Sequence, residues 1–444
     1  MPSDSTRPHV LYVCWGFPPS RGSGVYRGLA TANTLAELDC DVTVLTADRE
    51  MFIRSTGIDE SLEKLVDPRI KIVRVKFEWP ETERDISQWP LERAKDPAGW
   101  LANWNREAEA VFPETRYGAW LPGIVEAAEE IHRQSPIDLV VATANPNVDV
   151  AVGLHLYETA GVPYVYDQRD AWSLNVLTEL IDHRQDTLPA KMEKRLIESS
   201  MESWFVNDAI RDWYRQTYPQ ASSKMHSVMN GYDPDFSPAP NLLPADPAEQ
   251  LTVGYLGTIT PQVPLAETLE GWVQARETDP LVASAKLEFY GNLGHFAKAG
   301  SNERRLLQGA APYGVHYGGP AGKVNVREVY AKFDVLVFLT GGGKYVTSGK
   351  VFEYMASGLP IVSCHVPELA AAALLADYPL WFPTKDLSPE SIADAFSQAC
   401  AAAISADEAT RRRCIEHAAN YERSRQLREP LERVLAQAGS VVPK

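Results

Sequence analysis

The sequence TGGGKYVTSGKVFEYMASGLPIV, residues 340–362, decides the fold. The apolar run DVLVFL ends just before it at Leu339, and the glycines at 341–343 break the chain. A short helical segment follows, and the apolar run PIVSC begins at Pro360. A strand, a glycine-rich turn, a helix and a further strand in this order predict one unit of a parallel α/β sheet.

The start of this helix has the composition of an anion site. Thr347, Ser348 and Gly349 stand where the helix would begin, and free backbone N–H groups at the positive end of a helix dipole favour a phosphate. Lys350 would add a full positive charge, and Glu353, one turn further on the same face, can accept hydrogen bonds from two ribose hydroxyls. The alternative is an ordinary helix start with Ser348 or Thr347 as its N-cap.

A family resemblance runs through the same residues. FEYMASGLPIV resembles the EAMAxGxPVV segment of retaining nucleotide-sugar glycosyltransferases of the GT-B fold, glycosyltransferase family 4 in particular, and SGKVFEYMASGLPI is similar to the PSKxxEYMAxGKPI form of one subgroup. The resemblance implies that Glu353 binds the nucleotide ribose and that Ser348 and Lys350 hold the diphosphate. Tyr345 departs from the family, because many members have there the first glutamate of the motif, which touches the donor sugar.

Length, charge and cysteine content set bounds on the protein class. A chain of 444 residues exceeds what one core usually holds and therefore predicts two domains. The formal charge of −16 argues against a general nucleic-acid-binding surface. No apolar signal segment or bilayer-length run is present, so we expect a cytoplasmic protein. The five cysteines lack metal-ligand spacing, so neither a disulfide nor a metal site is expected.

The first half alternates apolar runs with helical patterns. HVLYVC at 9–14 leads into the turn WGFPPSRGSG and then into a helix. Gly22, Ser23 and Gly24 in this turn would let the backbone approach a ligand, although a plain tight turn fits them equally. FPPSRGSGVYR resembles the glycine-rich first loop of the same glycosyltransferases, which faces the donor phosphates and the acceptor. Further strands are expected over 41–47, 71–77, 137–145, 162–172, 203–207 and 226–230.

Polar residues follow two of these strands. Asn145 and the sequence QRD at 168–170 lie at carboxyl ends, where ligands collect in open α/β sheets. YDQRDAW resembles a family segment that often reads HD or RD followed by an aromatic residue, near the reacting sugar. Asp170 would orient a sugar hydroxyl or Arg169; the alternative is a buried Asp–Arg pair that supports the loop. The candidate catalytic residues are therefore Lys350, Arg169 and Asp170.

Residues 78–122 interrupt the alternation with seven aromatic residues among prolines and charges. Flat aromatic faces would stack on a sugar acceptor, and they would also suit a membrane interface that carries a lipid-linked acceptor. The alternative is an insertion whose aromatic residues pack on their own domain.

A second α/β series begins at LTVGYLG, residues 251–257. Further strands are expected over 287–291, 315–319, 334–339 and 360–364, and helices over 388–404 and 408–436. Gly319 and Pro320, at the exit of the strand over 315–319, are included among the donor-binding residues. After LGTITPQ the family commonly has a lysine that neutralises the diphosphate, whereas this chain has Val263. Lys350 would then compensate the charge together with residues drawn from Arg21, Arg27, Lys344 and Arg169.

These observations predict an α/β protein of the GT-B type, with two Rossmann-like domains that face each other across a cleft. The expected parts are an acceptor domain over 1–230 that contains the insertion 78–122, a proline-rich linker over 231–250, a nucleotide-sugar domain over 251–410, and a segment over 411–444. The family resemblance implies that the helix of this last segment crosses back to the first domain. NGYDPDF at the junction resembles the NGxDxxxF segment of the family.

The resulting hypothesis is a retaining glycosyltransferase of the hexosyltransferase type. A nucleotide-diphosphate sugar would serve as co-substrate, with no resident cofactor and no obligatory metal, and the acceptor would be a glycan, a lipid-linked sugar or a small molecule. The reaction would belong to cell-envelope polysaccharide or glycoconjugate synthesis, with peripheral contact to a membrane. The alternatives are a GT-B nucleotide-sugar epimerase and a noncatalytic nucleotide-sugar-binding partner.

Overall fold

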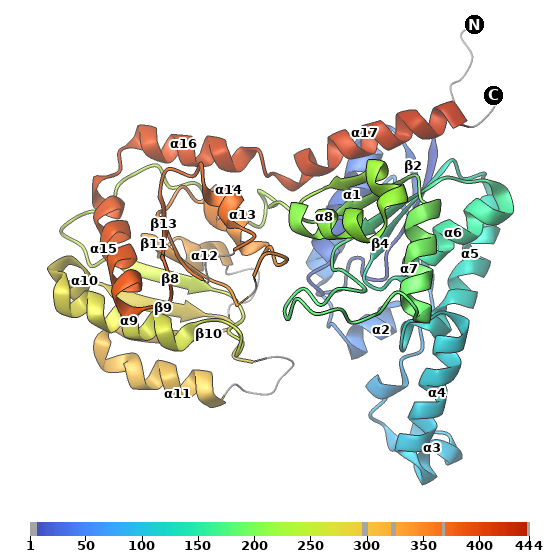
Figure 1. Cartoon of the computed structure of the whole chain (residues 1–444), viewed down its shortest axis with the longest axis horizontal. Helices are drawn as coiled ribbons and strands as arrows, with labels where there is room; N and C mark the ends of the chain where they lie inside the picture. The colour runs from blue at the N-terminus through green and yellow to red at the C-terminus, as the bar shows by residue number, and fades with distance from the viewer. Residues whose placement is uncertain (1–6, 295–300, 321–325, 342, 366–368, 442–444) are drawn as a thin grey trace, which may run out of the picture. The chain divides into compact units, whose positions relative to one another are not determined.

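The chain folds into two compact units, Met1–Met229 with Gln426–Lys444 and Asn230–Arg425 (Figure 1). The structure is a computed structural model that describes residues 7–294, 301–320, 326–341, 343–365 and 369–441. Residues 231–250, expected as a separate linker, belong to the second unit, and the chain returns to the first unit at Gln426.

The first unit is built, within the described residues, on a seven-stranded sheet of order β3-β2-β1-β4-β5-β6-β7 in which every pairing is parallel. The strands are β1 (His9–Val13), β2 (Asp41–Ala47), β3 (Lys71–Val75), β4 (Leu139–Ala144), β5 (Tyr164–Gln168), β6 (Glu202–Phe205) and β7 (Met225–Ser227). The direction of winding reverses between β1 and β4, and ligands of open α/β sheets collect outside the carboxyl ends of the strands at such a switch point.

The helices of this unit begin and end at recognisable residues. The Asn207 side chain accepts a hydrogen bond of 2.8 Å from the Ile210 N–H and so caps α8, and α6 ends at Gly161 with φ of +72°. The helices are α1 (Val25–Glu37), α2 (Arg49–Arg54), α3 (Leu91–Lys95), α4 (Pro97–Val111), α5 (Leu121–Gln134), α6 (Val148–Ala160), α7 (Leu188–Ser199), α8 (Asp208–Thr217) and most of α17 (Arg423–Val441).

The last helix, α17, completes the core of the first unit. Leu427, Leu431, Val434 and Ala438 recur at helical spacing and are buried in the cluster that contains Val10 and other residues of the sheet. The single helix expected over 408–436 is in fact two helices, α16 (Glu408–Ala419) and α17, separated at residues 420–422. The second of the two packs in the first unit although it follows the whole second unit in sequence.

The second unit contains, in the described part of the chain, a six-stranded parallel sheet of order β10-β9-β8-β11-β12-β13. Its strands are β8 (Thr252–Leu256), β9 (Lys286–Tyr290), β10 (Val315–Gly319), β11 (Val335–Leu339), β12 (Ile361–Cys364) and β13 (Trp381–Pro383). The helices are α9 (Leu265–Thr278), α10 (Pro280–Ser284), α11 (Ser301–Ala310), α12 (Val326–Tyr330), α13 (Lys350–Ala356), α14 (Ala372–Leu375), α15 (Pro389–Ser405) and α16. The strands expected from the sequence are all present, β10 with the expected bounds and the other four with ends shifted by one residue, and the three-residue β13 is the addition.

Helices cover both faces of this second sheet. Successive residues of a strand point to opposite faces. Val337 of β11 is buried in the same cluster as Phe396 of α15, whereas the next residue, Phe338, contacts Tyr354 of α13 with ring centroids 6.2 Å apart. Therefore α13, the helix predicted from the opening stretch, lies on the face opposite α15, and its first residue Lys350 follows the loop that leaves β11.

Candidate active site

The start of α13 carries no side-chain cap. Gly349 occupies the N-cap position, so the alternative interpretation with Ser348 or Thr347 as N-cap is wrong. The Ser348 hydroxyl instead accepts a long hydrogen bond of 3.4 Å from the Lys350 N–H. Thr347 and Ser348 are half-buried, and Gly349 is exposed. This short helix start therefore presents backbone and two hydroxyls at the carboxyl edge of the sheet.

Lys350 extends from α13 to the carboxyl end of β8. Its Nζ donates a hydrogen bond of 2.9 Å to the Tyr255 hydroxyl, and a Cβ added to Gly257 would lie only 1.7 Å from the same Nζ. Glycine at position 257 therefore makes room for the ammonium. No carboxylate in the described ranges forms an ion pair with Lys350, and an ammonium in this situation suits an anionic ligand.

Glu353 lies one turn after Lys350. Its Oε2 accepts a hydrogen bond of 3.0 Å from the hydroxyl of Tyr330, which is buried on α12, and Glu353 itself is half-buried. A carboxylate accepts hydrogen bonds only, as recognition of ribose hydroxyls requires. The two side chains thus offer a cation and an acceptor from one helix.

The second unit also contains Lys344, a further candidate for charge compensation, and Val263, which replaces the family lysine. Val263 is partly buried against the second hydrophobic core, so no cation stands at that position. The Nζ of Lys344 lies 5.0 Å from the centroid of the Tyr345 ring, as in a cation–π contact.

A cavity of about 310 Å³ opens beside the loop that follows β8. Its lining residues are Thr260–Glu267, Asn302, Glu303, Leu306, Thr340, Gly341 and Leu387. Two of them, Glu267 and Glu303, are acidic, which disfavours a phosphate. Lys350 and Glu353 do not line this cavity, so it is separate from the pair on α13.

Gly319 and Pro320 lie at the carboxyl end of β10, with φ of +81° at Gly319. In the strand order, β9 and β8 separate β10 from β11. These two predicted donor-binding residues therefore share the carboxyl edge with α13 but leave the sheet at a different strand.

In the first unit, the glycine-rich turn meets the loop after β5. Arg169 donates hydrogen bonds of 2.8 and 2.7 Å to the carbonyls of Ala144 and Asn145 at the end of β4. A Cβ added to Gly24 would lie 1.7 Å from Nη1 of Arg169, so the guanidinium packs directly on that glycine. Gly24 thus allows the close approach expected of the turn, although to a side chain of the protein itself. Gly22 is half-buried and Ser23 is exposed.

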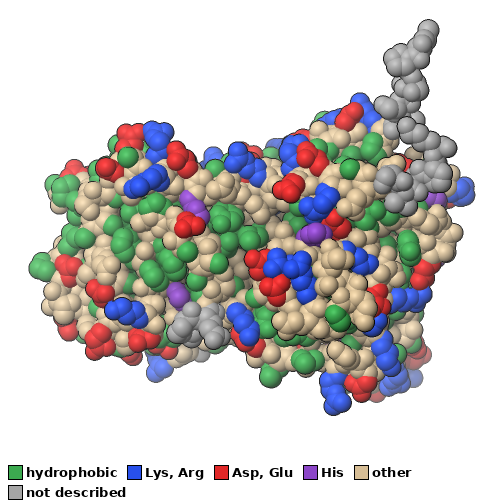
Figure 2. All heavy atoms as spheres, turned by 45° about the horizontal axis from the view of Figure 1, so that its top comes forward, with side chains coloured by type: hydrophobic (Ala, Val, Ile, Leu, Met, Phe, Trp, Pro, Cys, Tyr) green, Lys and Arg blue, Asp and Glu red, His purple; other side chains and the backbone are tan. Residues whose placement is uncertain are grey.

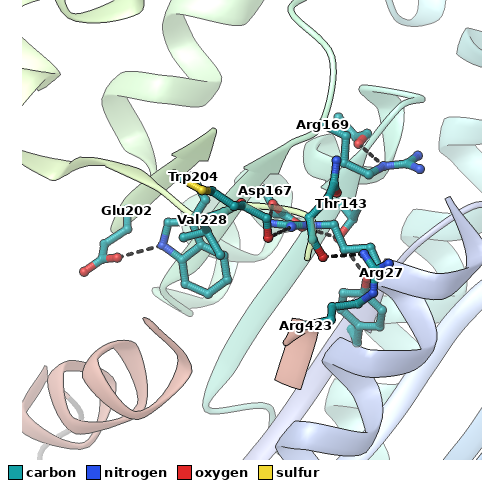
Figure 3. A network of polar contacts seen from close by, with 12 residues as sticks. Arg27, Thr143, Asp167, Arg169, Glu202, Trp204, Val228 and Arg423 are labelled. Atoms are coloured by element: carbon teal, nitrogen blue, oxygen red, sulfur yellow. Dashed lines mark hydrogen bonds and ion pairs between the residues drawn. The ribbon is translucent and has the colours of Figure 1, made fainter. Parts of the chain in front are cut away.

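Asp170 is exposed and accepts a hydrogen bond of 3.3 Å from the Asn145 side chain. It therefore does not form the buried Asp–Arg pair weighed from the sequence. That pair exists elsewhere, between Arg27 and Asp167, with hydrogen bonds of 2.7 and 2.6 Å (Figure 3).

The Arg27–Asp167 pair holds the first sheet to the segment after β7. Arg27 also donates hydrogen bonds to the carbonyls of Val228 and Met229, and Thr143 donates one of 3.0 Å to Asp167 (Figure 3). Arg27 is 1% exposed, so its guanidinium is committed to structure and the suggestion that it compensates a diphosphate is wrong. Asp167 stands inside the apolar run YVYDQ. A carboxylate in a buried strand needs a basic partner, so this residue was the feature of the sequence that indicated the pair.

Glu114 is a notable residue that sequence reasoning missed. Its carboxylate accepts hydrogen bonds of 2.9 Å from the backbone N–H groups of Asn147 and Val148, at the start of α6. Burial nevertheless raises the pKa of Glu114 to about 7. Glu114 comes from the insertion and lies outside regular structure in sequence, so no periodicity pointed to it. It connects the insertion to the loop that positions Arg169.

The aromatic residues of the insertion pack mostly on their own unit. Phe112 and Trp120 are buried, and Tyr117 stacks on Phe77 with ring centroids 5.5 Å apart. The rings of Trp89 and Trp100 lie 3.9 and 5.4 Å from the Arg93 guanidinium. Packing within the unit therefore accounts for these residues. Trp104 is half-buried, so part of its ring remains accessible on the insertion.

Acidic and basic side chains are interspersed on the face that Figure 2 presents.

Over the residues that the structure describes, no helix has the length and apolar character needed to cross a membrane. In the same residues, no group of three His, Cys, Asp or Glu side chains is arranged to hold a metal ion.

Residues 251–402, which lie within the second unit, match the family model described as Glycosyl transferases group 1. No curated protein matches the chain in sequence. Among solved structures, sucrose-phosphate synthase from Thermosynechococcus elongatus is similar at 15% identity and a TM-score of 0.63, over 98% of this chain and 100% of that one.

Two further structures are similar over nearly the whole chain. Trehalose 6-phosphate synthase from Burkholderia multivorans has 14% identity and a TM-score of 0.63, over 98% of both chains. Anabaena HepE in complex with UDP-glucose has 14% identity and a TM-score of 0.58, over 97% of this chain and 99% of that one. The fold shared with these structures and the family match of the second unit confirm the resemblance noted in the sequence: the chain has the GT-B fold, and its residues 251–402 match the glycosyltransferase group 1 family.

Proposed function

We propose that the chain is a retaining hexosyltransferase that uses a nucleotide-diphosphate sugar, with the diphosphate bound at Lys350 and the ribose at Glu353. The observation that carries the proposal is the pair on α13 at the carboxyl edge of β8 and β11. An ammonium that no described carboxylate neutralises and a carboxylate one turn away match the two polar parts of a nucleoside diphosphate. Thr347, Ser348 and Gly349 complete this donor site, and Gly319 and Pro320 belong to it at the exit of β10.

UDP is the first nucleotide to test, because Anabaena HepE was solved in complex with UDP-glucose. In the proposed reaction, the bond between the anomeric carbon and the diphosphate oxygen breaks, and negative charge develops on the departing diphosphate. Lys350 stabilises that charge more strongly than it stabilises the intact donor, which is the condition for lowering the barrier.

The acceptor hydroxyl forms the new bond on the face that the diphosphate leaves, and its proton passes to the departing phosphate oxygen. The anomeric configuration is retained. This scheme uses no resident cofactor and no obligatory metal.

We assign the acceptor side of the reaction to the first unit, with Arg169 and Asp170 at the loop after β5. Support comes from the position of these residues at the carboxyl ends of β4 and β5, next to the switch point. Gly22, Ser23 and Gly24, in the turn on which Arg169 packs, are counted among the donor-binding residues. The acceptor classes that fit are a glycan, a lipid-linked sugar and a small molecule, in cell-envelope polysaccharide or glycoconjugate synthesis. A lipid-linked acceptor would bring the protein into peripheral contact with a membrane.

The test is incubation with UDP-glucose and a panel of other nucleotide sugars, each with and without free sugars, sugar phosphates and lipid-linked sugars. Acceptor-dependent release of the nucleotide, and a product whose proton NMR coupling matches the anomeric configuration of the donor, support the proposal. An inverted product overturns the retaining mechanism. A donor that isomerises without acceptor indicates an epimerase, and saturable binding without turnover across the panel indicates a noncatalytic partner.

A further inference from the structure

The two charged side chains of α13 each end on the hydroxyl of a buried tyrosine. Lys350 donates to Tyr255 on β8, and Glu353 accepts from Tyr330 on α12, over 2.9 and 3.0 Å. Tyr255 and Tyr330 are 0% and 2% exposed. Neither hydroxyl is on the surface, so neither tyrosine is placed to contact a ligand directly.

The direction of the hydrogen bonds at Tyr255 is fixed by its other partner. The Tyr255 hydroxyl donates to the carbonyl of Thr258 over 2.9 Å, which leaves its oxygen to accept from the Lys350 ammonium. The Nζ also lies 4.6 Å from the centroid of the Tyr255 ring, as in a cation–π contact. With Gly257 making room beside it, the long lysine side chain is held at one place on the sheet edge.

Tyr330 is held equally firmly. Its ring meets the rings of Tyr354 and Phe333 edge to face, with centroids 6.0 and 6.4 Å away. Burial, together with the neighbouring Glu353 carboxylate, raises the pKa of Tyr330 well above its ordinary value. The hydroxyl therefore remains protonated at neutral pH and donates to Glu353, which fixes the orientation of that carboxylate.

We infer that Tyr330 and Tyr255 are positioning residues of the donor site, which hold the Glu353 carboxylate for the ribose hydroxyls and the Lys350 ammonium for the diphosphate. The inference rests on the proposed function. Its physical basis is that flexible charged side chains otherwise lose conformational entropy when they bind, whereas side chains that are already held lose less.

Removal of the two hydroxyls should have different effects, because Glu353 acts when the donor binds and Lys350 acts when the diphosphate departs. Glu353 contacts the ribose in the bound donor, so Tyr330→Phe should weaken nucleotide binding. A hydrogen bond to a charged group of this kind corresponds to roughly ten-fold in affinity. The loss should depend on the ribose hydroxyls, and it should disappear for a 2′,3′-dideoxynucleoside diphosphate. A tyrosine that merely supported the fold would affect both nucleotides alike.

The test is calorimetric titration with UDP, ADP and GDP, and with the 2′,3′-dideoxy form of whichever the wild-type protein binds most tightly. The variants are Tyr330→Phe, Glu353→Gln and the double variant. Tyr378→Phe is the matched control, since Tyr378 is another buried tyrosine of this unit and donates to the Leu359 carbonyl over 2.8 Å. We expect Tyr330→Phe to lose about ten-fold for the ribonucleotide only, no further loss when it is added to Glu353→Gln, and unchanged binding in Tyr378→Phe.

These measurements distinguish a failure of the proposed ribose site from a failure of the positioning role of Tyr330. If Glu353→Gln binds the ribonucleotide normally, the proposed ribose site falls and the positioning role falls with it. If Glu353→Gln is weakened but Tyr330→Phe is not, or if Tyr330→Phe loses equally for the dideoxy form, the positioning role alone is overturned.

Tyr255 is tested by turnover. Tyr255→Phe should lower kcat roughly ten-fold with little change in the KM of the donor, because the Lys350 ammonium is needed most when the diphosphate departs. The same change made in a Lys350→Ala protein should have no further effect. A rise in the donor KM without a fall in kcat overturns the role of Tyr255. An equally large further fall in kcat in the Lys350→Ala background overturns it as well.

Discussion

At the scale of single residues, Lys350 is the side chain on which the proposed chemistry depends most. Lys350→Ala should lower kcat by roughly a hundred-fold, which corresponds to about 3 kcal/mol of transition-state stabilisation, and should weaken donor binding less. Val263 supplies no second cation at the position where the family has a lysine, so few groups share the charge. Steady-state kinetics and nucleotide titration of the same preparation measure the two effects.

Lys332→Ala is the matched control for this prediction. Lys332 is an exposed lysine of the same unit whose Nζ also contacts an aromatic ring, that of Tyr290, at 5.5 Å. Its removal should leave kcat unchanged. A folded Lys350→Ala enzyme with wild-type kcat would falsify the assignment of Lys350 to the departing diphosphate.

At the scale of elements, the insertion is joined to α6 by the Glu114 carboxylate, and this contact should respond to pH. The pKa of Glu114 is raised from 4.5 to about 7 by burial, so the folded chain holds this proton more tightly than the unfolded chain does. The contribution to stability is therefore fully present below pH 4.5 and is lost as pH rises through about 7.

The comparison that isolates this effect is between wild type and Glu114→Gln, which cannot titrate. From pH 5 to 7 the wild-type stability should fall relative to the variant by at most about 1.4 kcal/mol per pH unit, the limit for one proton. Scanning calorimetry at several pH values measures it, with exposed Glu107→Gln on α4 as control. Wild-type and Glu114→Gln curves that run parallel would contradict the prediction.

The alternation of apolar runs with helical patterns was sufficient to predict the strands of both sheets, because buried parallel strands are continuous apolar segments. The pattern did not reveal β13, which is three residues long and ends in proline. It also ran across the break at residues 420–422, where two helices follow each other. Local sequence does not record which unit a helix packs against.

For the candidate site, sequence placed Lys350 and Glu353 on one helix, and the structure agrees. It did not distinguish a cation available to a ligand from one already paired. Arg27 resembled the other candidate cations in sequence, and only its contact with Asp167, 140 residues away, shows that it is structural. Tyr255, Tyr330 and Glu114 were missed for the same reason, since their partners lie far away in the chain.

At the scale of the whole molecule, the C-terminal helix should determine the stability of the first unit. Leu431 of α17 is fully buried in that unit, so Leu431→Ala should lower its stability by about 2–5 kcal/mol through the cavity it leaves. In calorimetry, the unfolding transition of the first unit should move to a lower temperature, and that of the second unit should not move. The exposed Glu432→Ala on the same helix is the control, and an equal shift of every transition, or none, would contradict the expectation.

The return of the chain to the first unit also has a consequence for synthesis on the ribosome. Residues 230–425 are translated between the two parts of the first unit, and at about 5–20 residues per second this takes roughly 10–40 s. Throughout that interval the nascent first unit lacks the apolar side chains of Leu427, Leu431 and Val434, and the surface they will cover is open to chaperones. The second unit, contiguous in sequence, can finish folding first, so vectorial synthesis completes the molecule in the reverse of its sequence order.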